Sequence, residues 1–204
     1  MRMLTLIRRI AWGSVALVGL LVLATVGGWF VTDGPAGGIR TPRVISAGAV
    51  APPFSMTDHR GRPFTQAELD GRPSMLFFGF TSCPDVCPTT LSDMGGWLDT
   101  LGPDADRVRP IFVTVDPERD GVAELAAYLT PFDHRIVGLT GSLGQLAAFA
   151  ASYRVYYRKV PTDSGYTMDH SASVFLFDRE RRFVGAVDFH EDQAIAIAKI
   201  RRLL

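Results

Sequence analysis

Two patterns of apolar residues recur along the chain from residue 47 onward. Short, nearly uninterrupted apolar runs are typical of buried strands, and they occupy residues 75–81, 109–115, 172–177 and 183–189. Apolar residues at helical spacing predict amphipathic helices over residues 89–101, 121–129, 142–151 and 191–204. Residues 153–160 alternate between polar and apolar, as an exposed strand does.

Strands that alternate with helices indicate an α/β fold, in which a central sheet carries helices on its faces. The polar turn at residues 178–182 joins the last two strands into an antiparallel hairpin, so the sheet is expected to be mixed. Strand, helix, strand, helix, an antiparallel hairpin and a final helix is the order of a thioredoxin-like fold.

A different pattern fills the N-terminal region. Residues 10–31 form an uncharged, largely apolar run of 22 residues behind the basic residues of segment 1–9. About 20 such residues cross a bilayer as a helix, and a basic flank stays in the cytoplasm. We therefore expect a single transmembrane anchor at 10–31, with a cleaved signal peptide as the alternative. The Gly- and Pro-rich stretch 32–46 reads as a linker to a domain at 47–204.

The net charge of the predicted domain limits the kinds of partner that it can bind. The chain has no formal net charge, but from residue 44 onward 16 basic residues face 20 acidic ones. A mildly acidic domain argues against nucleic acid as a partner, because nucleic-acid binding requires a basic face. Two of the 21 basic residues are lysines, Lys159 and Lys199, which is consistent with a bacterial source. The expected location is then the bacterial inner membrane, with the domain in the periplasm.

Two cysteines follow the first predicted strand. Cys83 and Cys87 are separated by three residues, and Pro88 comes next. Proline is common at the first helical position, so we expect Pro88 to open the helix, with Cys87 at its cap. A helix N-terminus stabilises thiolates. Such a pair can bind a soft metal such as Cu(I), or it can close a small disulfide in an oxidising compartment.

A third metal ligand must come from elsewhere in the chain. His59 lies in a polar turn, His134 in a loop, and His190 at the start of the last helix, so we expect them to be solvated or structural. His170 comes just before the buried run 172–177, where it can face the carboxyl end of a neighbouring strand and therefore the cysteine turn. Position alone leaves ligation by His170 and an ordinary loop histidine both open.

Four segments resemble the SCO/SenC family of copper-binding assembly proteins, in the right order across roughly residues 45–204. They read GFTSCPDVCPTTL (79–91), VTVDPERD (113–120), YRVYYRKV (153–160) and MDHSASVFLFD (168–178). The resemblance implies a thioredoxin-like fold and one copper ion, Cu(I) or Cu(II), per domain. It implies Cys83, Cys87 and His170 as the ligands, and a role in loading the copper centre of cytochrome c oxidase.

Further residues near these motifs are candidates for supporting roles. Asp169 precedes His170 as in the family pattern, and its carboxylate can orient the ring or carry its counter-charge. Asp85 lies between the cysteines, where it can tune the thiolates, contact a partner or simply be solvated. Asp116 follows a strand end on the same side and is expected to support the site or a turn. Among the methionines, Met168 is the one candidate for a thioether ligand.

The leading interpretation is a membrane-anchored copper metallochaperone that serves an oxidase subunit or another copper protein. The alternative is a thiol–disulfide oxidoreductase, in which Cys83 and Cys87 form the redox-active pair. Two departures from ordinary thioredoxins favour the metal: a three-residue spacer, and His170 in the neighbourhood of the usual proline. Disulfide exchange does not need this histidine.

Overall fold

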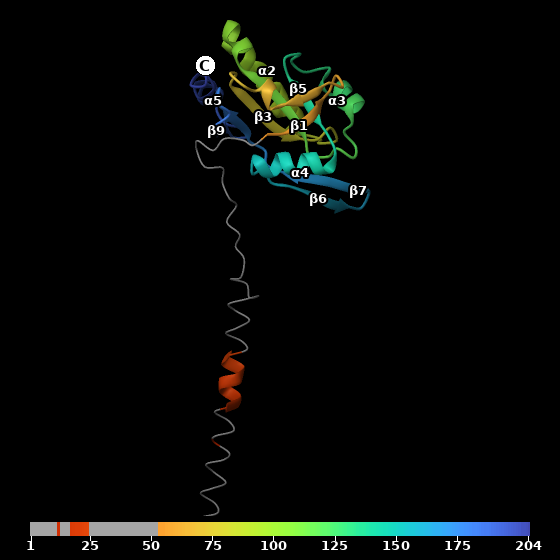
Figure 1. The fold of residues 1–204 in the computed structure, drawn as a ribbon, viewed down its shortest axis with the longest axis vertical. Coiled ribbons are helices and arrows are strands. Elements are labelled where there is room, and N and C mark those ends of the chain that lie inside the picture. The colour runs from red at the N-terminus through yellow and green to blue at the C-terminus, as the bar shows by residue number, and fades with distance from the viewer. Residues whose placement is uncertain (1–11, 13–16, 25–52) are drawn as a thin grey trace, which may run out of the picture. The chain divides into compact units, whose positions relative to one another are not determined.

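The computed structural model describes residues 12, 17–24 and 53–204 (Figure 1). The chain divides into two units, Met1–Arg43 and Val44–Leu204. Residues 17–24 are helical. Within the described parts of the chain, none of the helices combines the length and apolar character needed to span a bilayer. Most of the anchor expected at 10–31, the linker 32–46 and the start of the domain at 47 lie outside the described residues.

Residues 53–204 of the second unit are built on a mixed sheet of seven strands, which confirms the predicted α/β class (Figure 1). In spatial order the strands are β2 (Pro63–Thr65), β1 (Ser55–Asp58), β5 (Val137–Thr140), β4 (Arg109–Thr114), β3 (Ser74–Gly79), β8 (Val174–Phe177) and β9 (Phe183–Val187). β3, β4 and β5 are parallel, while β1, β2, β8 and β9 join them by antiparallel pairing.

Helices cover both faces of this sheet. One face packs against α3 through Phe112 and Tyr128, and the opposite face packs against α4 through Phe78 and Phe149. α2 and α5 contact each other. The helices are α2 (Val86–Leu101), α3 (Val122–Leu129), α4 (Leu143–Ser152) and α5 (Gln193–Arg201), with short 3-10 turns η1 (Gln66–Glu68) and η2 (Gly102–Arg107).

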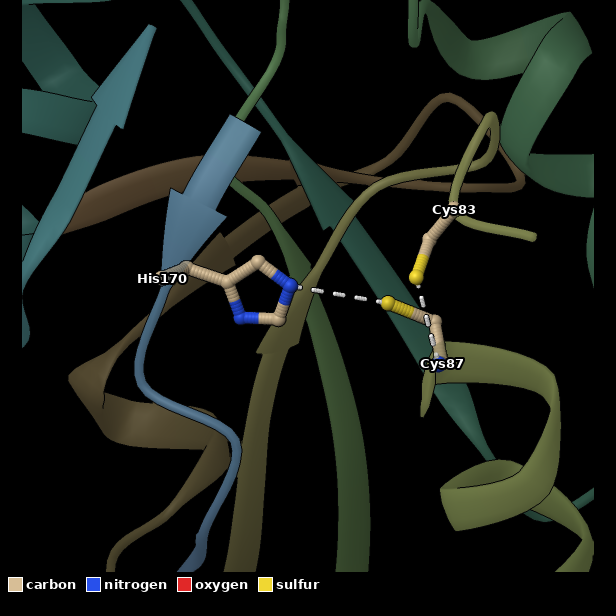
Figure 2. A group of neighbouring side chains, drawn as sticks. All are labelled: Cys83, Cys87 and His170. Atoms are coloured by element: carbon tan, nitrogen blue, oxygen red, sulfur yellow. Dashed lines mark hydrogen bonds between the residues drawn. The ribbon is translucent and has the colours of Figure 1, made fainter. Parts of the chain in front are cut away.

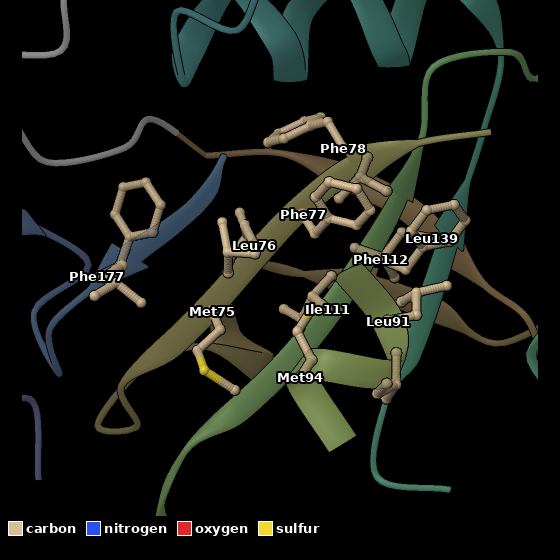
Figure 3. Packing of buried hydrophobic residues seen from close by; sticks show 14 of the residues in the cluster. Met75, Leu76, Phe77, Phe78, Leu91, Met94, Ile111, Phe112, Leu139 and Phe177 are labelled. Atoms are coloured by element: carbon tan, nitrogen blue, oxygen red, sulfur yellow. The ribbon is translucent and has the colours of Figure 1, made fainter. Parts of the chain in front are cut away.

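The core lies where β3 and β4 are covered on both sides (Figure 3). All six residues of β3 are buried, which explains why its sequence is continuously apolar rather than alternating. Leu91 and Met94 of α2 pack into the same cluster, as their helical spacing predicts. This rigid centre fixes the end of β3, from which the chain turns toward the two cysteines.

The strands and helices predicted between residues 75 and 151 and from residue 172 onward are confirmed. Three further strands of the sheet were not predicted. β1, β2 and β5 are only three or four residues long and partly polar, so they gave no clear periodic signal. The exposed strand expected at 153–160 was wrong in its extent. It is β6 (Tyr157–Thr162), which pairs with the unpredicted β7 (Gly165–His170) as a separate antiparallel sheet.

Candidate metal centre

Cys83, Cys87 and His170 converge at the carboxyl end of β3 (Figure 2). Their ligand atoms, two sulfurs and one ring nitrogen, all lie within 4.8 Å of one another. The Sγ atom of Cys87 is 3.7 Å from Nε2 of His170. Both cysteines are free thiols. Cys87 and His170 are 83 positions apart in the sequence, yet together with Cys83 they form one cluster of soft donors.

Cys87 lies inside the first turn of α2 rather than at its cap. The helix begins at Val86 with Asp85 as the N-cap, so the expectation that Pro88 opens the helix was wrong by two positions. Proline at position 88 is still tolerated, because N–H groups in the first turn have no partner within the helix. The side chain of Asp85 is exposed, and among the described residues it makes no capping hydrogen bond.

The Cys83 sulfur faces the amino end of the same helix. It accepts a hydrogen bond from the backbone N–H of Cys87, with a nitrogen–sulfur distance of 3.4 Å. The backbone N–H of Cys83 donates to the carbonyl of Phe80, which closes the turn after β3. The amino end of α2 thus supplies this sulfur with a backbone hydrogen-bond donor.

Cys87 does not share that environment. Its side chain is fully buried, and this burial raises the pKa of the thiol well above its ordinary value. The expectation that both cysteines lie where thiolates are favoured is therefore wrong for Cys87 in the metal-free protein. A buried sulfur of this kind becomes a thiolate when a cation binds beside it.

His170 ends β7 and points its ring toward the sulfurs. Nδ1 lies 2.9 Å from the carbonyl oxygen of Ser171, and a carbonyl can only accept, so Nδ1 carries the proton. Nε2 is then unprotonated and presents its lone pair to Cys87. Burial lowers the pKa of the ring, with the Ser171 carbonyl and the charge of Asp169 opposing this effect, so the neutral ligand form is favoured. The rings of Phe77 and Phe80 hold the imidazole edge-on.

Asp169 does not have the orienting role expected from the sequence. Its carboxylate accepts a hydrogen bond from the hydroxyl of Tyr156 and pairs with Arg158, while the Ser171 carbonyl holds the His170 ring. The reason is the alternation of side chains along a strand, which sends neighbouring residues to opposite faces. The charge of Asp169 does raise the pKa of His170, but this effect is secondary to that of burial.

Asp120, which was not predicted from the sequence as a site residue, supports the turn between Thr81 and Cys83. Its buried carboxylate accepts from the backbone N–H and the hydroxyl of Thr81, at 3.0 and 2.6 Å, and from the hydroxyl of Thr114 at 2.6 Å. Thr81 begins the turn that carries Cys83. The signal available in the sequence was the run VDPERD, whose last carboxylate proves to be the buried anchor.

Asp116 is buried and joins the β6–β7 hairpin to the loop after β4. It pairs with Arg119, and the hydroxyl of Tyr166 donates to its Oδ1 atom at 3.0 Å. Arg119 donates to the backbone carbonyl of Tyr166, and its guanidinium lies 3.9 Å from the centre of the tyrosine ring. Lys159 lies against the same ring at 4.1 Å. This cluster fixes the hairpin that ends in His170, so Asp116 supports the site indirectly, through this hairpin.

We expect Tyr166→Phe to lower the free energy of unfolding by about 1–2 kcal/mol, because a buried carboxylate loses a hydrogen-bond donor. In this variant, the backbone amide hydrogens of β6 and β7 should also exchange with solvent faster than those of the central sheet. Urea unfolding and native-state hydrogen exchange measure both effects. Tyr156→Phe is the matched control, because Tyr156 donates to the exposed Asp169. Equal effects of the two substitutions would contradict this role for Tyr166.

Gly79, at the end of β3, is a second residue that sequence reasoning missed. A Cβ atom at this position would lie 2.7 Å from the Cys87 sulfur and 2.7 Å from the Phe112 ring. The absence of a side chain therefore makes room for the sulfur against the sheet. The only available signal was a glycine at the end of a buried apolar run, which often marks a close approach of another group.

The remaining candidates have other roles. His59 lies in a turn, as expected, but it is partly buried and its Nδ1 accepts from the backbone N–H of Gly138, so its role is structural rather than that of a solvated residue. His134 is exposed, as predicted. His190 contacts the ring of Phe189 at a tilted angle in the turn before α5 and does not open the helix. Met168 is packed within the hydrophobic core.

Comparison with known proteins agrees with this geometry. The SCO1/SenC family model matches residues 43–204. The mitochondrial protein SCO2 of Saccharomyces cerevisiae is 37% identical over 163 residues, which are 78% of this chain and 54% of the yeast protein. The mitochondrial SCO2 homolog of Mus musculus is 38% identical over 167 residues, or 80% of this chain and 66% of that protein. The chain thus spans about half to two thirds of the length of these relatives.

Solved structures show the same fold. Copper-bound ScoI of Bradyrhizobium japonicum superposes with a TM-score of 0.71 and 45% identity, over 76% of this chain and 100% of that one. Yeast Sco1 with copper bound gives a TM-score of 0.69 and 37% identity, over 76% and 87% of the two chains. The thioredoxin-like architecture expected from the order of elements is the fold of these proteins. Since the family model covers most of the sequence, the chain belongs to the SCO1/SenC family.

Proposed function

We propose that this protein is a copper metallochaperone that binds one copper ion through Cys83, Cys87 and His170. The observation that carries the proposal is the convergence of two sulfurs and an unprotonated imidazole nitrogen at one point of the fold. The structures of ScoI from Bradyrhizobium japonicum and of Sco1 from yeast, which contain copper, support the choice of metal.

The donor set suits copper in both oxidation states. Thiolates select Cu(I), and an added imidazole suits Cu(II). Ligands about 2.3 and 2.0 Å from a metal, the usual distances for sulfur and nitrogen at zinc, lie roughly 3.7 Å apart in a trigonal arrangement. The Cys87–His170 separation of 3.7 Å therefore requires little rearrangement. Three protein ligands leave a position through which an acceptor can exchange.

The three ligands differ in their access to solvent. Cys87 is fully buried, whereas Cys83 and His170 are partly exposed. An acceptor protein therefore approaches copper from the side of Cys83 and His170, while Cys87 holds the ion until last. This order of release is consistent with transfer by stepwise ligand exchange.

We further propose that the copper is delivered during assembly of the cytochrome c oxidase copper centre, to an oxidase subunit or another copper protein. The copper-bound structures of ScoI and Sco1 support this cargo. Membership of the SCO1/SenC family, whose resemblance implies a role in oxidase assembly, supports this class of acceptor. Residues 10–31 would anchor the protein in the bacterial inner membrane, with the domain in the periplasm, as the charge and apolar pattern of the sequence indicate.

Copper titration of the reduced protein under anaerobic conditions tests the proposal. We expect one copper per chain. Cys83→Ala and His170→Ala should weaken binding by more than about 100-fold, since partners that only orient metal ligands already account for 10–100-fold. The His170 variant should also change the thiolate-to-Cu(II) absorption. His134→Ala, at an exposed histidine, is the control and should leave both measurements unchanged.

A thiol–disulfide oxidoreductase is the second candidate, because the two free thiols are neighbours at the amino end of a helix. Burial of Cys87 and the elevated pKa of its thiol disfavour rapid exchange at neutral pH. If the protein failed to bind stoichiometric copper while both thiols were reactive and turned over a disulfide substrate, the chaperone proposal would be replaced by this enzyme.

A further inference from the structure

A basic pocket lies at the opposite end of the central strands from the candidate metal centre. Its volume is about 230 Å³, and it is formed where the turn after β1, the loop before β3 and the starts of β4 and β5 meet. The cysteines follow the carboxyl end of β3, whereas the pocket surrounds Arg109 at the amino end of the parallel strand β4. Six residues of strand span roughly 20 Å, so the two sites are separate.

The pocket carries a clear excess of positive charge. Arg60, Arg72, Arg109 and Arg135 line it together with His134, and the acidic lining residue is Asp106. Arg135 is neutralised locally, because it pairs with Asp133 and Asp99. The other three arginines come from three different segments of the chain. Their convergence is therefore a product of the tertiary fold and not of one basic run in the sequence.

Arg109 shows that this charge is incompletely compensated. Within residues 53–204, its Nε atom is buried and has no hydrogen-bond partner. Burial lowers the pKa of its guanidinium, the nearby charge of Arg72 lowers it further, and Glu68 only partly opposes them. A buried donor without an acceptor destabilises the folded state, so an anion that accepts from this nitrogen would stabilise the arrangement.

We propose that this pocket is a binding site for a phosphate-type oxyanion. Guanidinium groups match the geometry of phosphate oxygens and can each donate two hydrogen bonds. Three arginines from separate segments can surround a tetrahedral anion. An anion with at least two charges fits best, because it offsets the excess that remains after Asp106 is counted. The chemistry is shared by free phosphates and by phospholipid headgroups.

Calorimetric titration of residues 44–204, without metal, tests the site with inorganic phosphate and pyrophosphate. This segment is a compact unit, and the whole solved chain of ScoI from Bradyrhizobium japonicum superposes on 76% of this protein, which supports independent folding of the segment. We expect saturable binding, tighter for pyrophosphate, and a shift of the Arg109 Nε–H resonance in ¹⁵N NMR spectra. The double variant Arg60→Gln/Arg72→Gln should bind about tenfold or more weakly. Arg201→Gln, at an exposed arginine outside the pocket, should change the affinity less than about twofold.

Vesicles of phosphatidylglycerol distinguish the two sources of phosphate. Vesicle binding that pyrophosphate displaces, and that the double variant loses, identifies a lipid headgroup. Pyrophosphate binding without vesicle binding identifies a free oxyanion. The proposal is overturned if pyrophosphate shows no saturable binding, or if Arg201→Gln weakens it as much as the double variant does, since general surface charge then explains the result. Unchanged thermal unfolding of each variant shows that the fold is intact.

Discussion

Replacing Gly79 with alanine should lower the free energy of unfolding by about 1–3 kcal/mol and weaken copper binding at least about tenfold. The new Cβ would lie 2.7 Å from both the Cys87 sulfur and the Phe112 ring. Phe112 is fully buried in the core and has little room to move. The sulfur must then shift, which changes its separation of 3.7 Å from the His170 nitrogen.

Gly96→Ala is the matched control for Gly79→Ala. Gly96 lies within α2, and a Cβ atom there would meet nothing within 4 Å. Alanine is favoured over glycine inside a helix, so this change should stabilise the protein by about 0.5–1 kcal/mol without affecting copper. Urea unfolding of the metal-free protein and copper titration measure both variants. Parental stability and copper affinity in Gly79→Ala would show that the sulfur does not need this space.

Asp120→Asn should lower the free energy of unfolding by about 2–4 kcal/mol. The fully buried carboxylate accepts three hydrogen bonds, two from Thr81 and one from Thr114. Asparagine offers one oxygen, and its NH2 group would face hydroxyl or N–H donors. The cost of leaving buried donors unpaired sets the expected magnitude. Because Thr81 starts the turn that carries Cys83, copper affinity should fall as well.

Asp104→Asn provides the comparison for Asp120→Asn, since it makes the same chemical change at an exposed position. Asp104 pairs with Arg107 at the surface, where such pairs contribute at most about 1 kcal/mol. Denaturant unfolding should therefore separate the two variants clearly. If Asp120→Asn unfolded at the same urea concentration as Asp104→Asn, the buried carboxylate would not be the anchor of the cysteine turn.

The parts of the fold that were predictable are those whose signal is local. β3, β4 and β8 have largely buried sequences that are almost continuously apolar, and β9 is apolar although most of its residues are only half-buried. α4 shows its start in the sequence as well, because Ser142 and Gln145 form a reciprocal capping box. β7, by contrast, reads GYTMDH and is stabilised by its pairing with β6 and by the Asp116 cluster, neither of which leaves a periodic pattern.

The candidate site also has parts that could be predicted from local sequence and parts that could not. Cys83 and Cys87 lie within one turn, so their proximity follows from five consecutive residues. His170 could be proposed from its position, but the hairpin that delivers it was not foreseen. The exposed carboxylate of Asp169 faces Tyr156 and Arg158. Its position next to His170 in the sequence therefore did not predict which residues it contacts.

The α/β class, the cysteine pair, the acidic character of the domain and the family resemblance could all be predicted from the amino-acid sequence, because they depend on short-range patterns and motif order. Only the folded structure shows how the β6–β7 hairpin brings His170 to the sulfurs, that Gly79 leaves space for Cys87, and that Asp120 anchors the turn. It also brought Arg60, Arg72 and Arg109 into one pocket. Such contacts join residues tens of positions apart, and their energies come from burial and pairing in the folded state, which no local pattern encodes.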